Sequence, residues 1–353
     1  MTTDFAVSSQ FARANPALVY GRNSDDDYRL STPAAKAGGC LIPAGFSAQE
    51  AFQLADCDFS VEKRPVQVPA PDGTTVTARE HIAIVRTDTG AVLGVHGNNY
   101  TPVQKSAMVQ LLDYLREDLQ IENVLALRGG QMIFATASLD LEAEITQGER
   151  IRRYLHLCNS HDGSSAFSVA WSSTRLFCAN QIEYLSGKAM AHARRDGTGL
   201  SMRHTRSVEA FARSLPERID LEQQRFRRSI NELKPLTTLR LSTAQARQVL
   251  EHTYATQLQR PITDRSSGQI RERRLEDLPQ YETIRSHYEG GTGIAIEPGT
   301  AWGLFQAISQ YESHDAGRRK DPIAAARSRL ISLWGGEGGQ RIERARSACL
   351  AMG

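Results

Sequence analysis

The sequence has no long apolar run. No stretch approaches the roughly 20 consecutive apolar residues that a helix needs to cross a bilayer. The segment 1–30 also lacks the basic-then-apolar pattern of a secretion signal. These absences predict a cytoplasmic protein without a membrane partner. Its 353 residues, 40% of them hydrophobic, suffice for one large domain or two ordinary ones.

Cysteine is scarce, and its spacing excludes two classes of small fold. No pair forms a C-x-x-C motif, which argues against a zinc ribbon, and an odd number argues against a disulfide framework. We expect reduced, mostly buried thiols. The five cysteines are Cys40, Cys57, Cys158, Cys178 and Cys349.

Nucleotide-binding and hydrolase motifs are also missing. The chain contains no G-x-x-x-x-G-K phosphate loop and no G-x-S-x-G elbow. The Gly-rich stretch "YEGGTGIAIEPG" lacks the preceding strand and the following helix of a dinucleotide fingerprint. Cys158 and Cys178 fall inside apolar strand patterns, where structural thiols are commoner than reactive ones. The sequence therefore predicts no cofactor and favours a protein that is not an enzyme.

Charge is distributed unevenly along the chain. Residues 1–149 hold 11 Lys and Arg against 19 Asp and Glu, whereas residues 150–353 hold 31 against 21. Within the second part, residues 150–228 carry 14 basic and 7 acidic side chains. A basic half is the minimal electrostatic footprint of a polyanion-binding protein, although solvated helix faces produce the same count. Arginine dominates, and its fork matches phosphate bidentately.

Turn signals between alternating runs predict an antiparallel sheet. Pro-Asp-Gly at 71–73, Thr-Asp-Thr-Gly at 87–90, Gly129-Gly130 and Asp162-Gly163 each separate two extended runs. "SAQEAFQLAD" reads as a short helix with Ser47 as its N-cap, and "TPVQKSAMVQLLDYLREDL" as an amphipathic helix with Pro102 near its first turn.

After the block "CANQIEYLSGK", residues 178–188, the pattern becomes helical. "SVEAFARSLPERIDLEQQRFRRSINEL", "STAQARQVLEHTYATQL", "TAWGLFQAISQYESH" and "PIAAARSRLISLW" are predicted helices, and "GGEGG" a loop. The fold class is α+β: a curved antiparallel sheet of consecutive β-hairpins packed by helices on one side, followed by a helical C-terminal part. We expect a flexible segment over 1–45, a sheet-plus-helix core domain over 46–235 and a helical region over 236–353.

The His161-Asp162 pair resembles the paired ligands of metal-dependent phosphohydrolases. Such sites need further His and Asp ligands on helices, at a spacing that brings them onto one metal ion. Asp-Gly is also the favoured pair for a type I′ turn, because it accepts positive φ. We therefore expect a structural hairpin motif without a metal. It comprises Asn159, His161, Asp162, Gly163 and, at the strand-to-helix junction, Asn180.

Cationic side chains around this hairpin are the candidate nucleic-acid site. By the period of two, Arg152, Tyr154, His156 and Cys158 share one face of their strand and Arg153 the other. An Arg-rich, Gly-containing loop follows downstream. Arginine would hold backbone phosphates while bases stack on aromatic rings. The candidate contacts are Arg152, Arg153, His156, Arg175, Arg194, Arg195, Arg203, His204 and Arg206.

Several blocks together resemble a family of bacterial phage- and plasmid-borne proteins, domain of unknown function 932. The blocks are "FSVEKRPV", "VRTDTGAVLGVHGNNYTPVQ", "LRGGQMIFATASL", "YLHLCNSHDGSSAFSVAWSSTRLFCANQI", "MRHTRSVE" and "TAWGLFQAISQYESH", over roughly residues 45–315. The chain departs from the family pattern at Gln104-Lys105, usually Gln-Asn, and at Ala179, usually Gln or Thr.

The resemblance implies mobile genetic elements as the context and brings no established activity. Consecutive hairpins backed by a long helix also resemble, at the level of fold, ring-forming single-strand annealing proteins. The leading hypothesis is a single-stranded DNA-binding protein that promotes annealing, as a homo-oligomer. The alternatives are a metal-dependent nuclease that uses His161 and Asp162, and an interaction module that counters host defence without binding nucleic acid.

Overall fold

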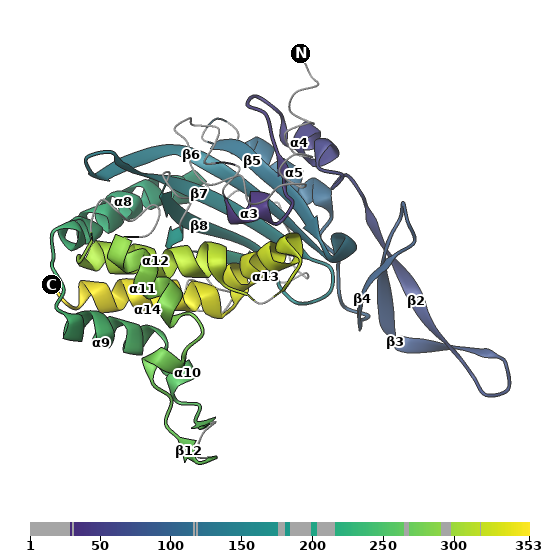
Figure 1. Ribbon diagram of the computed structural model, residues 1–353. Coiled ribbons are helices and arrows are strands. Elements are labelled where there is room, and N and C mark those ends of the chain that lie inside the picture. The colour runs from purple at the N-terminus through teal and green to yellow at the C-terminus, as the bar shows by residue number, and fades with distance from the viewer. Residues whose placement is uncertain are drawn as a thin grey trace.

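The computed structural model describes residues 29, 32–115, 117, 119–175, 181–183, 199–202, 216–264, 268–290, 298–317 and 319–353. A large antiparallel sheet crosses the molecule with helices on both faces, and a small sheet projects from one end (Figure 1). The α+β class and the consecutive hairpins are as predicted. The helices on two faces, rather than on one side only, correct the sequence-based expectation.

The large sheet is built around four long strands in sequence order. These are β5 (Leu119–Leu127), β6 (Met132–Thr146), β7 (Glu149–Ser160) and β8 (Phe167–Arg175). The short strand β1 (Cys40–Leu41) pairs with β5, while β9 (Gln181–Glu183) and β10 (Gly199–Met202) both pair with β8. The turns predicted at Gly129-Gly130 and Asp162-Gly163 join β5 to β6 and β7 to β8.

The two hairpins nearer the N-terminus form a separate sheet. Strands β2 (Val61–Pro69), β3 (Thr75–Arg86) and β4 (Val92–Gly97) pair in that order. Strand β4 reaches only His81–Val85 of β3, so β2 and β3 continue past it as a two-stranded ribbon. The ribbon extends away from the rest of the molecule (Figure 1).

One face of the large sheet is covered by two short helices. Helix α4 (Ala48–Leu54) begins with the predicted capping box, in which Ser47 and Glu50 satisfy each other's backbone N–H groups. Helix α5 (Lys105–Tyr114) begins later than predicted, because the Gln104 side chain is bound to the backbone N–H and C=O of Val61. These helices share one hydrophobic core with Leu155 and Leu157 of β7.

The other face carries the C-terminal helices and a larger core. They are α8 (Pro216–Leu233), α9 (Thr243–Thr253), α10 (Ala255–Leu258), α11 (Tyr281–Gly290), α12 (Ala301–Gln310), α13 (Pro322–Gly335) and α14 (Glu337–Leu350). The short helix α3 (Pro33–Lys36) packs against α13. This core joins residues of β5–β8 to residues up to Cys349, so it spans position 235, where the sequence predicted a domain boundary.

Helix α14 was not predicted, and its first turn lies in the presumed "GGEGG" loop. Gly338 and Gly339 are both buried. A Cβ on Gly338 would lie 3.0 Å from the Ser332 hydroxyl, so the glycine permits close packing of α14 on α13. The remaining elements are the turns η2 (Arg128–Gly130), η3 (Lys234–Thr237) and η4 (Leu275–Asp277), the π-helical η5 (Tyr311–Asp315), and a hairpin of β11 (Ile262–Thr263) and β12 (Ile270–Arg271). No helix within the described ranges has both the length and the apolarity to span a membrane.

Candidate functional site

Arg152 and its neighbour Arg150 both bind an acidic side chain of the adjacent strand. Both guanidinium groups bind the Glu142 carboxylate on β6, and Arg152 also lies 3.6 Å from the Glu122 carboxylate. Burial raises the pKa of Glu142, but the hydrogen bonds from the two arginines outweigh it and hold that pKa below its ordinary value. The sequence predicted that Arg152 contacts a phosphate. In the fold, its charge is paired with carboxylates of the same sheet.

Arg153 points to the opposite face of β7, as the alternation predicted. Its guanidinium donates to the Ser173 hydroxyl at 2.8 Å, and the residue is 4% exposed. Burial to this degree does not favour the predicted contact with a nucleic-acid phosphate. The period of two predicts the face of a strand on which a residue lies, but not what covers that face.

His156 lies between the sheet and helix α13. Its ring nitrogens contact the hydroxyls of Thr136, at 3.1 Å, and Ser172, at 2.6 Å, and its ring meets the edge of Trp334. Complete burial, assisted by the positive charge of Arg153, lowers the pKa of His156 to about 3. A neutral imidazole at physiological pH follows from this pKa, which does not favour the predicted role of His156 as a cation for phosphate.

The other predicted contacts lie mostly outside the described residues. Arg175 ends strand β8 opposite Ile151, and only its backbone is described. The remaining members of the set all fall in undescribed ranges: Arg194, Arg195, Arg203, His204 and Arg206. Asn180, predicted as part of the structural hairpin motif, also lies outside the described residues.

The predicted turn at Asp162-Gly163 is present and is built by its own side chains. The Asp162 carboxylate accepts hydrogen bonds from the Ser160 hydroxyl and the Ser164 backbone N–H, both at 2.8 Å. Gly163 has a φ of +77°, a conformation that favours glycine. Arg128 of the neighbouring turn lies 3.4 Å from the same carboxylate. Burial raises the pKa of Asp162, yet these contacts hold it below its ordinary value.

The turn contacts a segment more than 50 residues away in the sequence. The His96 ring donates to the His161 carbonyl at 2.8 Å, and the Tyr100 hydroxyl donates to the Ser160 carbonyl at 3.1 Å. The two rings stack with centroids 3.9 Å apart and planes 8° apart. Asn159 donates to the Val103 carbonyl at 2.8 Å. The blocks "VHGNNYTPV" and "NSHDGSS" thus form one structural unit, which we call the joint.

The joint attaches the small sheet to the turn end of the large sheet. Arg86 of β3 donates to the Gly129 carbonyl at 3.1 Å, and the Gln131 side chain donates to the Leu93 carbonyl of β4 at 3.0 Å. Arg86 also lies over the Phe59 ring, which faces the ring of His161. Two hairpin turns of the large sheet therefore hold β3 and β4.

The geometry of the joint does not suit His161 and Asp162 for metal binding. The His161 side chain is packed inside, at 1% exposure, and the Asp162 oxygens already accept from serine groups and face Arg128. Among the described residues, no group of three or more His, Cys, Asp or Glu side chains could hold a metal ion. Here the pair braces a turn.

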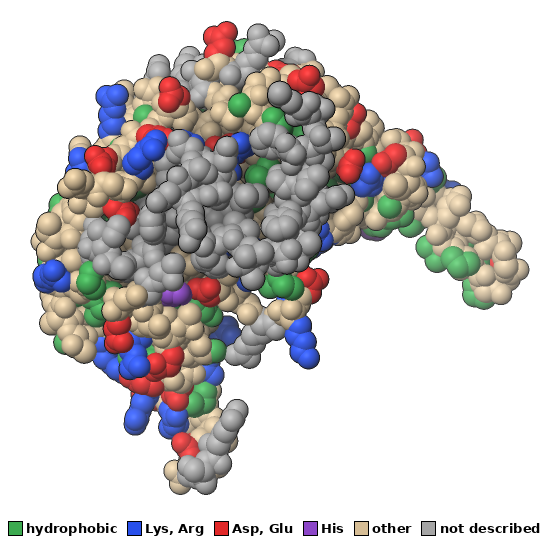
Figure 2. Space-filling model, turned by 45° about the horizontal axis from the view of Figure 1, so that its top comes forward, with side chains coloured by type: hydrophobic (Ala, Val, Ile, Leu, Met, Phe, Trp, Pro, Cys, Tyr) green, Lys and Arg blue, Asp and Glu red, His purple; other side chains and the backbone are tan. Residues whose placement is uncertain are grey.

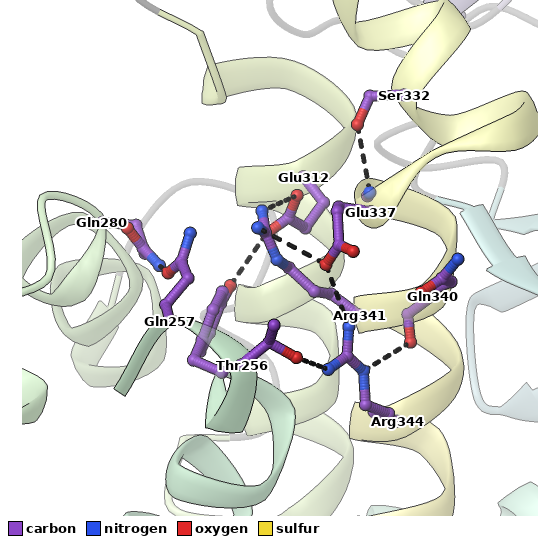
Figure 3. A network of polar contacts seen from close by, with 11 residues as sticks. Thr256, Gln257, Gln280, Glu312, Ser332, Glu337, Gln340, Arg341 and Arg344 are labelled. Atoms are coloured by element: carbon purple, nitrogen blue, oxygen red, sulfur yellow. Dashed lines mark hydrogen bonds and ion pairs between the residues drawn. The ribbon is translucent and has the colours of Figure 1, made fainter. Parts of the chain in front are cut away.

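A buried acid in the C-terminal helices was missed from the sequence. Glu312, in the π-helical turn after α12, accepts from the Tyr254 hydroxyl at 3.0 Å and lies 3.4 Å from Arg341 of α14 (Figure 3). Burial raises the pKa of Glu312 despite the nearby arginine. On the outer side, Arg344 binds Thr256 and Glu337. The network fastens α14 to the turn that follows α12 and to the end of α9, and no local pattern in the sequence marks Glu312 as buried.

Comparison with known proteins gives one family. The family model described as "Domain of unknown function (DUF932)" matches residues 92–334. Searches of curated proteins and of solved structures found no match. The matched range begins at β4 and ends in α13, so it includes the joint and Glu312 and leaves out the β2–β3 ribbon.

Proposed function

We propose that this chain, which belongs to the DUF932 family and so to a family defined without a function, binds single-stranded nucleic acid. DNA is the preferred form, and the chain promotes annealing rather than catalysing a reaction. Annealing requires strands held by their phosphates with the base edges left free, and arginine contacts to phosphate provide this.

The charge balance of the sequence supports a polyanionic ligand. Arg150 and Arg152 are paired with Glu142, and beyond them residues 175–228 carry 11 basic and 6 acidic side chains. The excess of positive charge therefore falls on the part of the chain that leads into helix α8 and through most of it. Each phosphate that such a segment contacts releases bound counterions, which makes the affinity salt-dependent.

The observation that carries the proposal is the outward face of α8. Phe226, Ile230 and Leu233 are buried in the larger core, whereas Arg227 and Arg228 are exposed on the side away from it. The Arg228 side chain is 83% exposed, and it forms an ion pair at 3.3 Å with Glu232, which is 44% exposed and also binds Arg346. Such pairs contribute little free energy, so a phosphate can replace the carboxylate at small cost.

The proposal is tested by titrating fluorescent single- and double-stranded oligonucleotides between about 50 and 200 mM salt. We expect tighter binding of the single strand and a binding constant that falls as salt rises. In R227A/R228A the slope of log K against log salt should be shallower by about 1.4, since each single-strand phosphate contact contributes about 0.7.

The matched control is R247A/R285A, which removes the same charge from exposed positions on α9 and α11. It should bind with the slope of the unmodified chain. Absence of single-strand binding at low salt, or binding that does not respond to salt, would overturn the proposal.

A further inference from the structure

The ribbon of β2 and β3 has an unusual surface for a structure surrounded by water. Nine large hydrophobic side chains are exposed in the described part of the chain, and four of them, Val68, Val76, Val92 and Val95, lie on the small sheet. Val68 and Val76 are directly opposite each other on adjacent strands and are 52% and 57% exposed. Figure 2 shows hydrophobic side chains gathered on the outer part of this projection.

The outer ribbon has little to hold it in place. Gln67–Pro69 pairs with Thr75–Thr77, and the hairpin closes at a turn in which Asp72 accepts from the backbone and hydroxyl of Thr74. A two-stranded hairpin is marginally stable in water unless another strand or surface covers it. Within this chain the third strand, β4, ends before this part of the ribbon.

The two outer edges of the ribbon differ. On β2, Pro65 and Pro69 lack backbone N–H groups, which is how natural proteins block an edge. On β3, the edge beyond β4 contains no proline, and the Asn98 side chain binds the Arg79 carbonyl near the point where β4 ends. The segment Thr75–Ala78 is therefore the edge that can accept a further strand.

Charge identifies the class of partner. Between Glu62 and Glu80 the ribbon carries three acidic and three basic side chains, so it has no net attraction for nucleic acid or for an anionic membrane. A balanced surface of this kind is complementary to itself. An identical edge related by a two-fold axis also satisfies the antiparallel hydrogen-bonding pattern of both strands.

We propose that the ribbon is a self-association element: two copies of the chain join through the Thr75–Ala78 edges, with Val76 of one copy opposite Val76 of the other. The two ribbons then form one four-stranded sheet. Its central row is Val68, Val76 and the same two residues of the second copy, and cross-strand pairs of β-branched side chains are favourable. This inference is independent of the proposed nucleic-acid binding.

Sedimentation of the full chain over a range of concentrations tests the interface. We expect the unmodified chain to be at least a dimer, and V68T/V76T to dissociate about tenfold more readily, a change of about 1.4 kcal/mol. Threonine keeps the shape and strand preference of valine, so the fold should be retained, and an unchanged melting temperature checks this. V92T, at an equally exposed valine of β4, is the control and should associate normally.

A crosslink fixes the register. With V76C, oxidation should give a reducible covalent dimer, because opposed strand positions bring Cβ atoms within disulfide distance. V92C should give none. A monomeric unmodified chain at all concentrations would overturn the proposal, as would a V68T/V76T variant that associates as the unmodified chain does, or a crosslink that forms equally at 92 and 76.

Discussion

At the scale of single residues, the polar side chains of β7 show how burial changes chemistry. His156 and Arg153 belong to opposite faces of one strand, and each bonds to a hydroxyl of β8. Neither is available as a surface cation. Serine and threonine hydroxyls suit a neutral imidazole, since each can donate to one ring nitrogen or accept from the other. His156 therefore serves as a hydrogen-bonding core residue.

The buried imidazole predicts a pH dependence of stability. The pKa of His156 is about 3 in the folded chain and about 6.5 in the unfolded chain, so the unfolded state binds the extra proton between these values. Stability from this group is complete above pH 6.5 and falls as the pH drops toward 3, by up to about 1.4 kcal/mol per pH unit.

Urea denaturation of the unmodified chain and of H156Q, from neutral pH downward, measures this contribution. Glutamine keeps a donor and an acceptor and does not titrate. The difference in unfolding free energy between the two proteins should shrink as the pH falls below 6.5. If the unfolding free energies of the two proteins changed equally with pH, His156 would be protonated in the folded state or would not be buried.

At the scale of elements, the joint depends on a close approach between β4 and the β7–β8 turn. A Cβ on Gly94 would lie 2.5 Å from the His161 carbonyl oxygen, a backbone atom that cannot move aside cheaply. Gly97 is on the same strand, and the nearest atom to a Cβ there is 3.9 Å away. The two glycines provide a matched pair within a single strand.

We expect G94A to weaken the joint and G97A to leave it intact. Overpacking against backbone costs on the order of 1–3 kcal/mol. The measurement is the free energy of unfolding, together with amide hydrogen exchange at His161 and Asp162, which should speed up in G94A alone. Equal effects of the two substitutions would contradict the close contact.

How far the sequence predicts these elements depends on the range of the interactions. Local sequence patterns were enough to predict the Ser47 cap, the turn at Asp162-Gly163 and the alternation along β7. The start of α5 was misplaced because a side chain bound Val61, 43 residues away. Helix α14 was missed because glycines that serve packing look like loop residues.

The candidate site was less predictable than the fold. Periodicity placed Arg152 and His156 together, but their partners Glu142 and Trp334 come from a neighbouring strand and a distant helix. The contact between His96 and His161 likewise joins two polar blocks with no shared pattern. Long-range contacts of this kind determine which cations remain exposed, and a single sequence does not encode them in any local signal.

At the scale of the whole molecule, one core joins the large sheet to the C-terminal helices. Phe134 of β6 meets Trp334 of α13 edge to face, with ring centroids 4.6 Å apart. Phe226 and Leu233 of α8 and Trp302 of α12 belong to the same cluster. Removal of the C-terminal helices would expose one entire face of the sheet to water.

A fragment of residues 46–235 is therefore expected not to fold cooperatively, although the sequence alone predicted a domain of that extent. It should lack near-ultraviolet circular dichroism and bind hydrophobic dyes, whereas residues 32–353 should melt in one transition. A sharp thermal transition of the shorter fragment would show that the sheet forms an independent domain.

The joint also has a mechanical consequence. Among the described residues, the small sheet is bound to the rest of the molecule at the base of the ribbon. Arg86, Leu93 and His96 contact the two hairpin turns of the large sheet there, and Val61 binds Gln104. The joint is therefore the point about which the ribbon can rotate. A small rotation there displaces the tip of the ribbon by a large distance. Conversely, binding of the tip to a partner restricts rotation at the joint. The β7–β8 turn belongs to the joint, so it is the part of the large sheet that responds first to this binding.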